Sequence, residues 1–196
     1  YREYKLNLSG FQDILTNIIF FFVSIFIFIF SIGPDKETIS ILGIGIVWTL
    51  LLLSSTLSLR KFYQDDFESG NLLIMHLNGF SYGFIAILKT FSHFLFVQVP
   101  FLLSIPIACI LLNITSDKLF YLLASFVIGS FILSCLGSIS SSMNLMNQRN
   151  FLLGSVIVMI FSVPIIIFSV GIINMEENFN SLINILFGIL LIVFAI

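Results

Sequence analysis

Long apolar runs separated by short polar connections dominate the chain. Six runs approach or exceed the length needed to cross a bilayer whose hydrocarbon core is about 30 Å thick. They are residues 15–32, 41–59, 91–112, 119–140, 151–172 and 182–196. Each run predicts a transmembrane α-helix, because a helix satisfies its own backbone hydrogen bonds within lipid. The pattern therefore predicts an all-α integral membrane protein with six spans in a single domain, residues 1–196.

The composition supports a membrane protein. The chain is 59% hydrophobic and only 9% charged, with 24 Phe, and its mean hydropathy is +1.15. These values lie far outside the range of soluble domains. The first run is followed by Gly33-Pro34 and a second membrane-length run, so we expect it to be a span and not a cleaved signal peptide.

Lysine and arginine are distributed unevenly between the connections. Six of the eight precede the first, third or fifth run, namely Arg2, Lys5, Arg60, Lys61, Lys89 and Arg149. Lys36 and Lys118 lie in the alternate connections. The positive-inside rule then places the N-terminus and the connections 60–90 and 142–150 on the cytoplasmic or matrix side. Six spans would return the C-terminus to that side.

The connection between the second and third runs holds a dense group of charges. Five fall within nine residues: Arg60, Lys61, Asp65, Asp66 and Glu68. Each would cost roughly 2.5–3.5 kcal/mol at the centre of a bilayer, so we expect this segment outside the membrane.

The first half of the same segment, 60–79, predicts an amphipathic helix, and a second short segment follows at 71–77. Phe62, Tyr63 and Phe67 recur at helical spacing and are expected to face the membrane or neighbouring spans. Gly70 is expected to end the helix, since glycine readily takes the left-handed conformation. Residues 1–13 mix aromatic and charged side chains and predict a second helix, lying in the membrane interface before the first span.

Small residues repeat along the fourth run. Ser130, Ser134 and Ser138 are spaced by four, and Gly129 extends the small surface. Small residues at this spacing allow close approach of helices, although serines can also line a polar conduit. Close packing is the favoured interpretation, because serine hydroxyls can return hydrogen bonds to their own backbone.

Motifs for catalysis are missing from the sequence. No P-loop, HExxH, GxSxG or Cys/His cluster occurs, so we expect a non-enzymatic chain without a metal, without its own ATP site and without a nucleic-acid partner. Asp65 and Asp66 are adjacent, and adjacent helical residues point about 100° apart, which does not suit an acid and base pair. Cys109 and Cys135 lie in apolar runs and are expected to be buried core residues.

Lys89 and His93 lie one helical turn apart at the start of the third run. His93 could be an axial ligand of haem, since imidazole binds iron well. It could instead be a polar anchor that hydrogen-bonds to a neighbouring helix, which is the interpretation we favour.

Several stretches together resemble the CcmB family, the membrane subunit of an ABC-type complex in cytochrome c maturation. They begin with REYKLNL at 2–8 and continue in the family's order through SIGP at 31–34, GIVWTLLLLSSTLSL at 45–59, F-x-x-D-D-x-x-x-G at 62–70, LKTFSHF at 88–94 and VPIIIF at 163–168. The sequence departs from the family at Arg60 and Leu73, where acidic residues are common, and at Ile18, where a proline is common.

The resemblance implies a six-span ABC-2-type exporter permease that forms a homodimer in the bacterial or mitochondrial inner membrane. It implies a separate CcmA-like ATPase that binds ATP, and partners resembling CcmC, CcmD and the haem chaperone CcmE, with haem handled by the complex. Segment 60–79 would then couple the ATPase to the spans. In this hypothesis Asp65, Asp66 and Glu68 contact the ATPase, while Arg60, Lys61 and Phe62 hold the segment and Gly70 turns it. A general lipid or drug exporter of related architecture is the alternative function.

Overall fold

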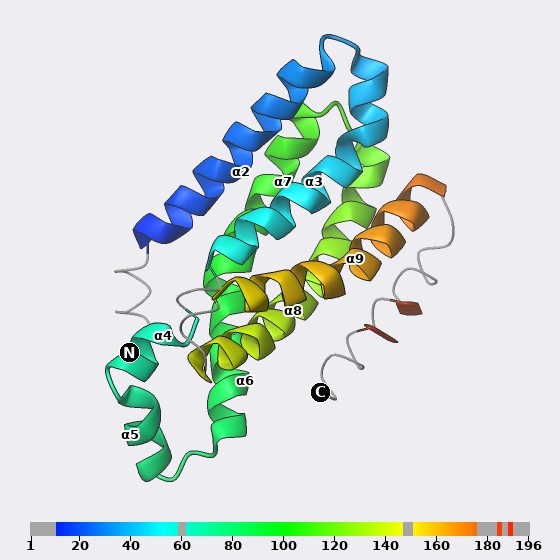
Figure 1. Ribbon diagram of the computed structural model, residues 1–196. Coiled ribbons are helices and arrows are strands. Elements are labelled where there is room, and N and C mark those ends of the chain that lie inside the picture. Colours follow the sequence, from blue (N-terminus) through cyan, green and yellow to red (C-terminus); the bar gives the residue numbers. More distant parts are fainter. Residues whose placement is uncertain (1–10, 59–61, 147–150, 176–183, 186–187, 190–196) are drawn as a thin grey trace.

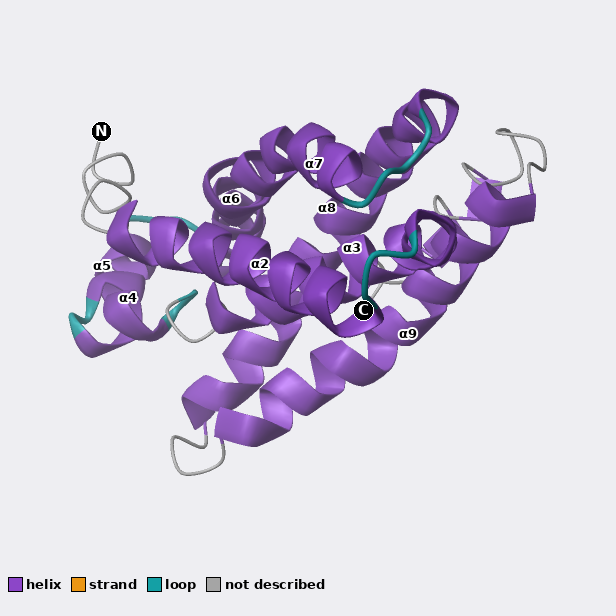
Figure 2. Ribbon diagram, turned by 90° about the horizontal axis from the view of Figure 1, so that it is seen from above, coloured by secondary structure: helices purple, strands orange, loops and turns teal. Residues whose placement is uncertain are grey.

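The computed structural model describes residues 11–58, 62–146 and 151–175, with two short pieces at 184–185 and 188–189 (Figure 1). Every regular element in these ranges is a helix (Figure 2). The expected interfacial helix over 1–13 and the expected sixth span over 182–196 fall largely outside the described residues. Arg60 and Lys61 lie outside them as well.

The first two long helices form a hairpin. Helix α2 spans Phe11–Ile32 and α3 spans Lys36–Ser58, and the two pack along one another (Figure 1). Gly33 turns the chain between them with φ +89°. Asp35 caps the N-terminal end of α3, because its carboxylate accepts hydrogen bonds from the backbone N–H of Glu37, at 3.2 Å, and from the Thr38 hydroxyl. This arrangement matches an N-terminal helix cap.

The third span is one continuous helix of 30 residues, Tyr82–Leu111. It consists of α6 (Tyr82–His93), the π-helical turn η2 (Phe94–Gln98) and α7 (Val99–Leu111). The helix begins at Tyr82, ahead of the apolar run 91–112 that predicts the span. Ser81 caps the helix, accepting a hydrogen bond at 3.2 Å from the Phe84 N–H. The π-helical turn ends beside Pro100, which has no N–H to donate to the helix ladder.

Helices α8 and α9 complete the described bundle. Helix α8 spans Ser116–Met146, longer at both ends than the predicted 119–140, and packs against α9, Phe151–Met175 (Figure 1). Helix α3 lies among the others and contacts α2, α7, α8 and α9. The largest fully buried side chains come from α3, α2, α7 and α8: Trp48, Phe21, Phe101 and Phe126.

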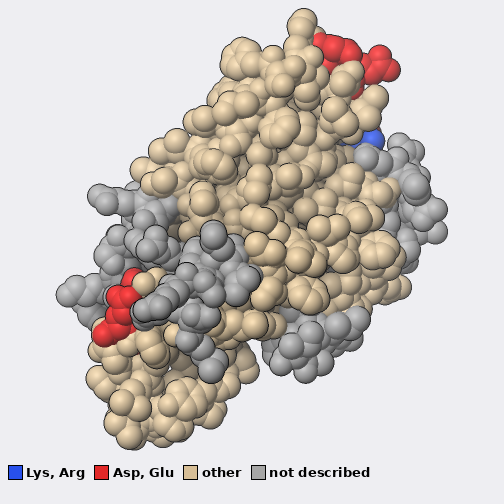
Figure 3. Space-filling model, viewed as in Figure 1, with Lys and Arg blue, Asp and Glu red and all other residues tan. Residues whose placement is uncertain are grey.

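Charged side chains lie at the two ends of the bundle (Figure 3). Four of the described helices are long and apolar enough to cross a membrane: Ile14–Ile32, Lys36–Ser58, Tyr82–Leu111 and Ser116–Leu145. Their outer surfaces are apolar, with Phe30 and Ile110 about four-fifths exposed. Large apolar side chains on the outside of a helix bundle are expected where lipid surrounds it. The chain is therefore a multi-pass membrane protein.

Candidate functional site

Two short helices extend from one end of the bundle (Figure 1). Helix α4 spans Gln64–Glu68 and α5 spans Asn71–Leu77. Gly70 joins them in the left-handed conformation, with φ +69°, as the sequence predicted. An added Cβ would meet no atom within 4 Å, so glycine is needed here for its backbone conformation and not for space.

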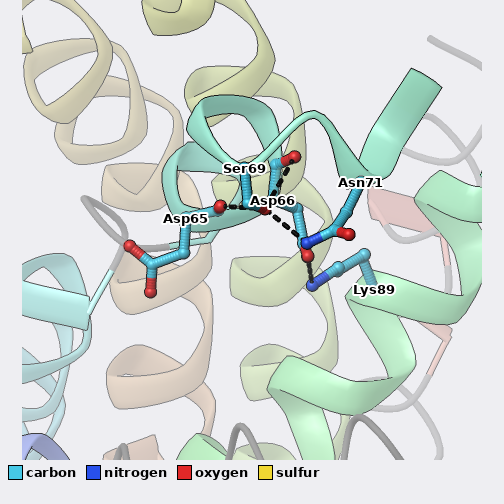
Figure 4. A network of polar contacts seen from close by, with 5 residues as sticks. All are labelled: Asp65, Asp66, Ser69, Asn71 and Lys89. Atoms are coloured by element: carbon cyan, nitrogen blue, oxygen red, sulfur yellow. Dashed lines mark hydrogen bonds and ion pairs between the residues drawn. The ribbon is translucent and has the colours of Figure 1, made fainter. Parts of the chain in front are cut away.

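Side-chain hydrogen bonds stabilise this turn (Figure 4). The Ser69 hydroxyl donates to the carbonyl oxygen of Asp65 at 2.7 Å, and the Asn71 side-chain amide donates to the Ser69 hydroxyl. Both bonds are local, and α5 buries none of its side chains. Helix α5 is therefore held to α4 through this turn, while its partly buried Leu72 packs against the hydrophobic core.

The two adjacent aspartates of α4 have opposite environments. Asp65 is exposed, whereas Asp66 is 3% exposed. The carboxylate of Asp66 forms an ion pair with the ammonium of Lys89 on α6, whose side chain is 12% exposed (Figure 4). Charges in such surroundings must be paired, because leaving one unpaired is very unfavourable. The structure thus directs Asp66 inward, while Asp65 and Glu68 remain on the outer surface.

The residues immediately before α4 are buried in the bundle. Phe62 and Tyr63 are 7% and 5% exposed, and their ring centroids lie 4.8 Å apart. The Tyr63 hydroxyl lies 2.6 Å from the Ser138 hydroxyl of α8. Burial raises the pKa of Tyr63, partly opposed by this hydrogen bond, so the phenol stays neutral. Phe67 differs from these two, since it is half exposed.

His93 lies where three helices meet. Its Nε2 is 2.9 Å from the Ser58 hydroxyl of α3, and its Nδ1 is 3.1 Å from the Ser134 hydroxyl of α8. The Phe62 ring packs on the imidazole with a centroid separation of 4.8 Å. Both ring nitrogens have hydrogen-bond partners, which favours the polar-anchor interpretation over ligation of haem iron.

The small residues of α8 pack closely against other helices. A Cβ at Gly129 would lie 2.3 Å from Cη2 of Trp48, so α3 and α8 approach too closely for a larger residue. Ser130 and Ser134 are fully buried, and their hydroxyls donate to backbone carbonyls of their own helix at 3.1 and 3.0 Å. These contacts favour helix packing over a conduit lining.

The sequence alone did not reveal which side chains meet. Asp66 lies on α4 and Lys89 on α6, with α5 between them along the chain, and Tyr63 and Ser138 are 75 positions apart. The serine spacing was visible, but nothing in it identified His93 and Tyr63 as partners. Within the described ranges, no three His, Cys, Asp or Glu side chains gather where they could hold a metal ion.

Comparisons with known proteins identify the family of this chain. The family model described as "CcmB protein" matches residues 1–196. "Heme exporter protein B" of Haemophilus influenzae is 30% identical over 165 residues, which cover 84% of this chain and 75% of that protein. The protein of the same name from Pseudomonas aeruginosa is 26% identical over 170 residues, 87% of this chain and 76% of that protein. The chain therefore belongs to the CcmB family of haem exporter membrane subunits.

Proposed function

We propose that this chain is the membrane permease subunit of an ABC transporter complex in cytochrome c maturation. ATP hydrolysis on a separate subunit would be coupled through it to haem handling, including release of a haem-loaded chaperone. The observation that carries the proposal is the match of the CcmB family over residues 1–196. The names of the Haemophilus and Pseudomonas relatives support the connection with haem.

The α4–α5 segment is the proposed coupling element. It extends from the bundle at one charged end (Figure 3). Asp65 and Glu68 are exposed on it. Acidic side chains on an outer surface can form complementary contacts with a basic partner surface. We assign Asp65 and Glu68 to contact with the ATPase, Arg60 and Lys61 to the membrane interface, and Gly70 to the turn.

The proposed complex contains a CcmA-like ATPase on the α4 side and partners resembling CcmC, CcmD and the haem chaperone CcmE. Two copies of this chain would pair, each with six spans and both termini in the cytoplasm of a bacterium. The excess of Lys and Arg in alternate connections supports this orientation.

Depletion of the protein tests the proposed function. Covalent haem in c-type cytochromes should disappear on a haem-stained gel, and the haem-loaded chaperone should accumulate. Re-expression of the wild-type chain should reverse both effects. Normal amounts of c-type cytochromes after depletion would contradict the proposal and favour a general lipid or drug exporter.

Charge reversal on the outer face of α4 tests the coupling element. Asp65→Lys combined with Glu68→Lys should release the ATPase subunit during co-purification, because two acidic contacts become repulsive. The matched control is Asp117→Lys in the first turn of α8, at the other charged end. That variant should retain the ATPase. Equal retention by both variants would refute the assignment.

A further inference from the structure

We propose that two buried contacts clamp the coupling element to the bundle, so that α4 moves together with α6 and α8. The contacts, called the clamp below, are the Asp66–Lys89 ion pair and the Tyr63–Ser138 hydrogen bond. Asp66 and Lys89 are then positioning residues for energy transfer and not contacts for the ATPase. This inference rests on the proposed function and concerns how the same segment works.

The spacing of residues around α4 separates an inner face from an outer face. Tyr63 and Asp66 are three positions apart and both are buried. Asp65 and Glu68 are also three positions apart, and both are exposed. Residues three apart lie on the same side of a helical turn. The exposed side can therefore contact a partner, while the buried side packs against the bundle.

The ion pair is the stronger half of the clamp. It joins α4 to α6 with both side chains largely out of solvent, at 4% and 12% exposure. If α4 moved without α6, this ion pair between two poorly solvated charged groups would be broken, which is costly. If α4 and α6 move together, the ion pair stays intact.

The hydrogen bond gives the clamp its second point on a different helix. Tyr63 contacts Ser138 on α8, whereas Asp66 contacts Lys89 on α6. Two attachments on separate helices resist rotation of α4 about either one. The clamp therefore transmits both the position and the orientation of α4.

His93 extends the connection to a third helix. The Phe62 ring packs on its imidazole, which bonds to Ser58 on α3 and Ser134 on α8. A displacement of α4 would thus reach α3, α6 and α8 through packed side chains. Helix α5 has no fully buried side chain, and its Leu72 packs against the core only partly buried, so α5 is connected to the bundle less firmly than α4.

The test separates attachment of the ATPase from use of its energy. Asp66→Asn and Lys89→Gln should each retain the ATPase on co-purification, yet lower covalent haem in c-type cytochromes at least tenfold. Exchanging the charges, Asp66→Lys with Lys89→Asp, should restore covalent haem to within about threefold of wild type. Glu37→Gln, at the opposite end of the bundle, is the matched control and should behave as wild type.

Two milder variants distinguish a loss of coupling from simple misfolding. Tyr63→Phe and Ser138→Ala each remove one hydroxyl. Each should lower the amount of covalent haem in c-type cytochromes, although the purified complex still hydrolyses ATP. Because they break the same contact, the double variant should be no worse than the poorer single one. ATP turnover per membrane-inserted protein should stay within about twofold of wild type.

Three results would overturn the clamp. Normal covalent haem in all four single variants would show that the contacts transmit nothing. Loss of the ATPase from Asp66→Asn would show that Asp66 serves docking. A charge exchange that inserts normally but restores no covalent haem would show that pairing is irrelevant.

Other outcomes bear on the other proposals. Failure of the Asp65 and Glu68 reversals to release the ATPase would refute the docking surface, and depletion without loss of cytochromes would refute the proposed function.

Discussion

Adding one methyl group at Gly129 should destabilise the bundle. The new Cβ of Gly129→Ala would lie 2.3 Å from Cη2 and 3.1 Å from Cζ3 of Trp48, and 3.4 Å from Cγ2 of Ile165. Trp48 is fully buried, and its ring centroid is 5.7 Å from that of Phe126. The indole must therefore move by about 1 Å within a packed core, where such shifts are resisted.

The magnitude follows from two opposing effects. Overpacking of a core typically costs about 1–3 kcal/mol, and the clash with a stiff, enclosed ring favours the upper part of that range. Replacing a helical glycine by alanine in itself stabilises the helix by about 0.5–1 kcal/mol. We expect a net loss of about 1–2.5 kcal/mol, which for a chain of this length lowers Tm by about 2–10 °C.

The assay is thermal unfolding of the detergent-solubilised protein, with all variants heated at one scan rate. Gly45→Ala is the matched control, because Gly45 lies within α3 and its added Cβ would meet nothing within 4 Å. That variant should keep or raise Tm by about 1–4 °C. If Gly129→Ala were as stable as Gly45→Ala, the close approach of α3 and α8 would be refuted.

A double-mutant cycle identifies the clashing partner. Trp48→Phe removes the distal ring of the indole, including Cη2 and Cζ3, and should itself lower Tm. In that background Gly129→Ala should cost nothing further, since the obstructing atoms are gone. An undiminished cost would show that Trp48 is not the obstacle.

Three other predictions follow from single sites. Gly70→Ala should cost about 1–2 kcal/mol, because φ is +69°, and Gly70→Asn should cost less, as equilibrium unfolding would show. The Thr38 hydroxyl, then the Glu37 backbone N–H, lower the pKa of Asp35 below its ordinary 3.8. The ionised Asp35 therefore stabilises the fold above about pH 4, and this stabilisation is lost as pH falls through the folded pKa of Asp35. Thr38→Val should weaken this dependence of stability on pH, as Tm values measured over a pH series would show. Gln98 is 1% exposed and neither end of its amide has a partner among the described residues, so Gln98→Leu should raise stability by about 1–3 kcal/mol, and a lower Tm would contradict this.

The helical character of the chain was predictable because hydrophobicity and length alone determine which segments can cross a bilayer. The start of the helix at Tyr82 was not predictable in this way. Residues 82–90 contain Lys89, whose charge interrupts the apolar run, and the ion pair with Asp66 that accommodates this charge is a tertiary contact. Local pattern cannot show such a pairing, so the apolar run alone predicts a span that starts at 91.

The candidate site was predictable as a segment but not residue by residue. Charge density identified the region of α4, and glycine's conformational freedom identified the turn at Gly70. Helical geometry indicated that Asp65 and Asp66 point in different directions, yet only packing decides which one points inward. The roles of Ser134 and Ser138 likewise depend on His93 and Tyr63, which come from distant parts of the chain.

Site-specific photo-crosslinking tests the central claim most directly, namely that the outer face of α4 meets the ATPase. A photoreactive residue at Glu68 in the assembled complex should form an adduct with the ATPase subunit, because Glu68 is exposed on that face. The same residue at Ile110, which is 80% exposed near the far end of α7, should form none. An ATPase adduct from position 110, or none from position 68 in a complex that retains its ATPase, would contradict the account.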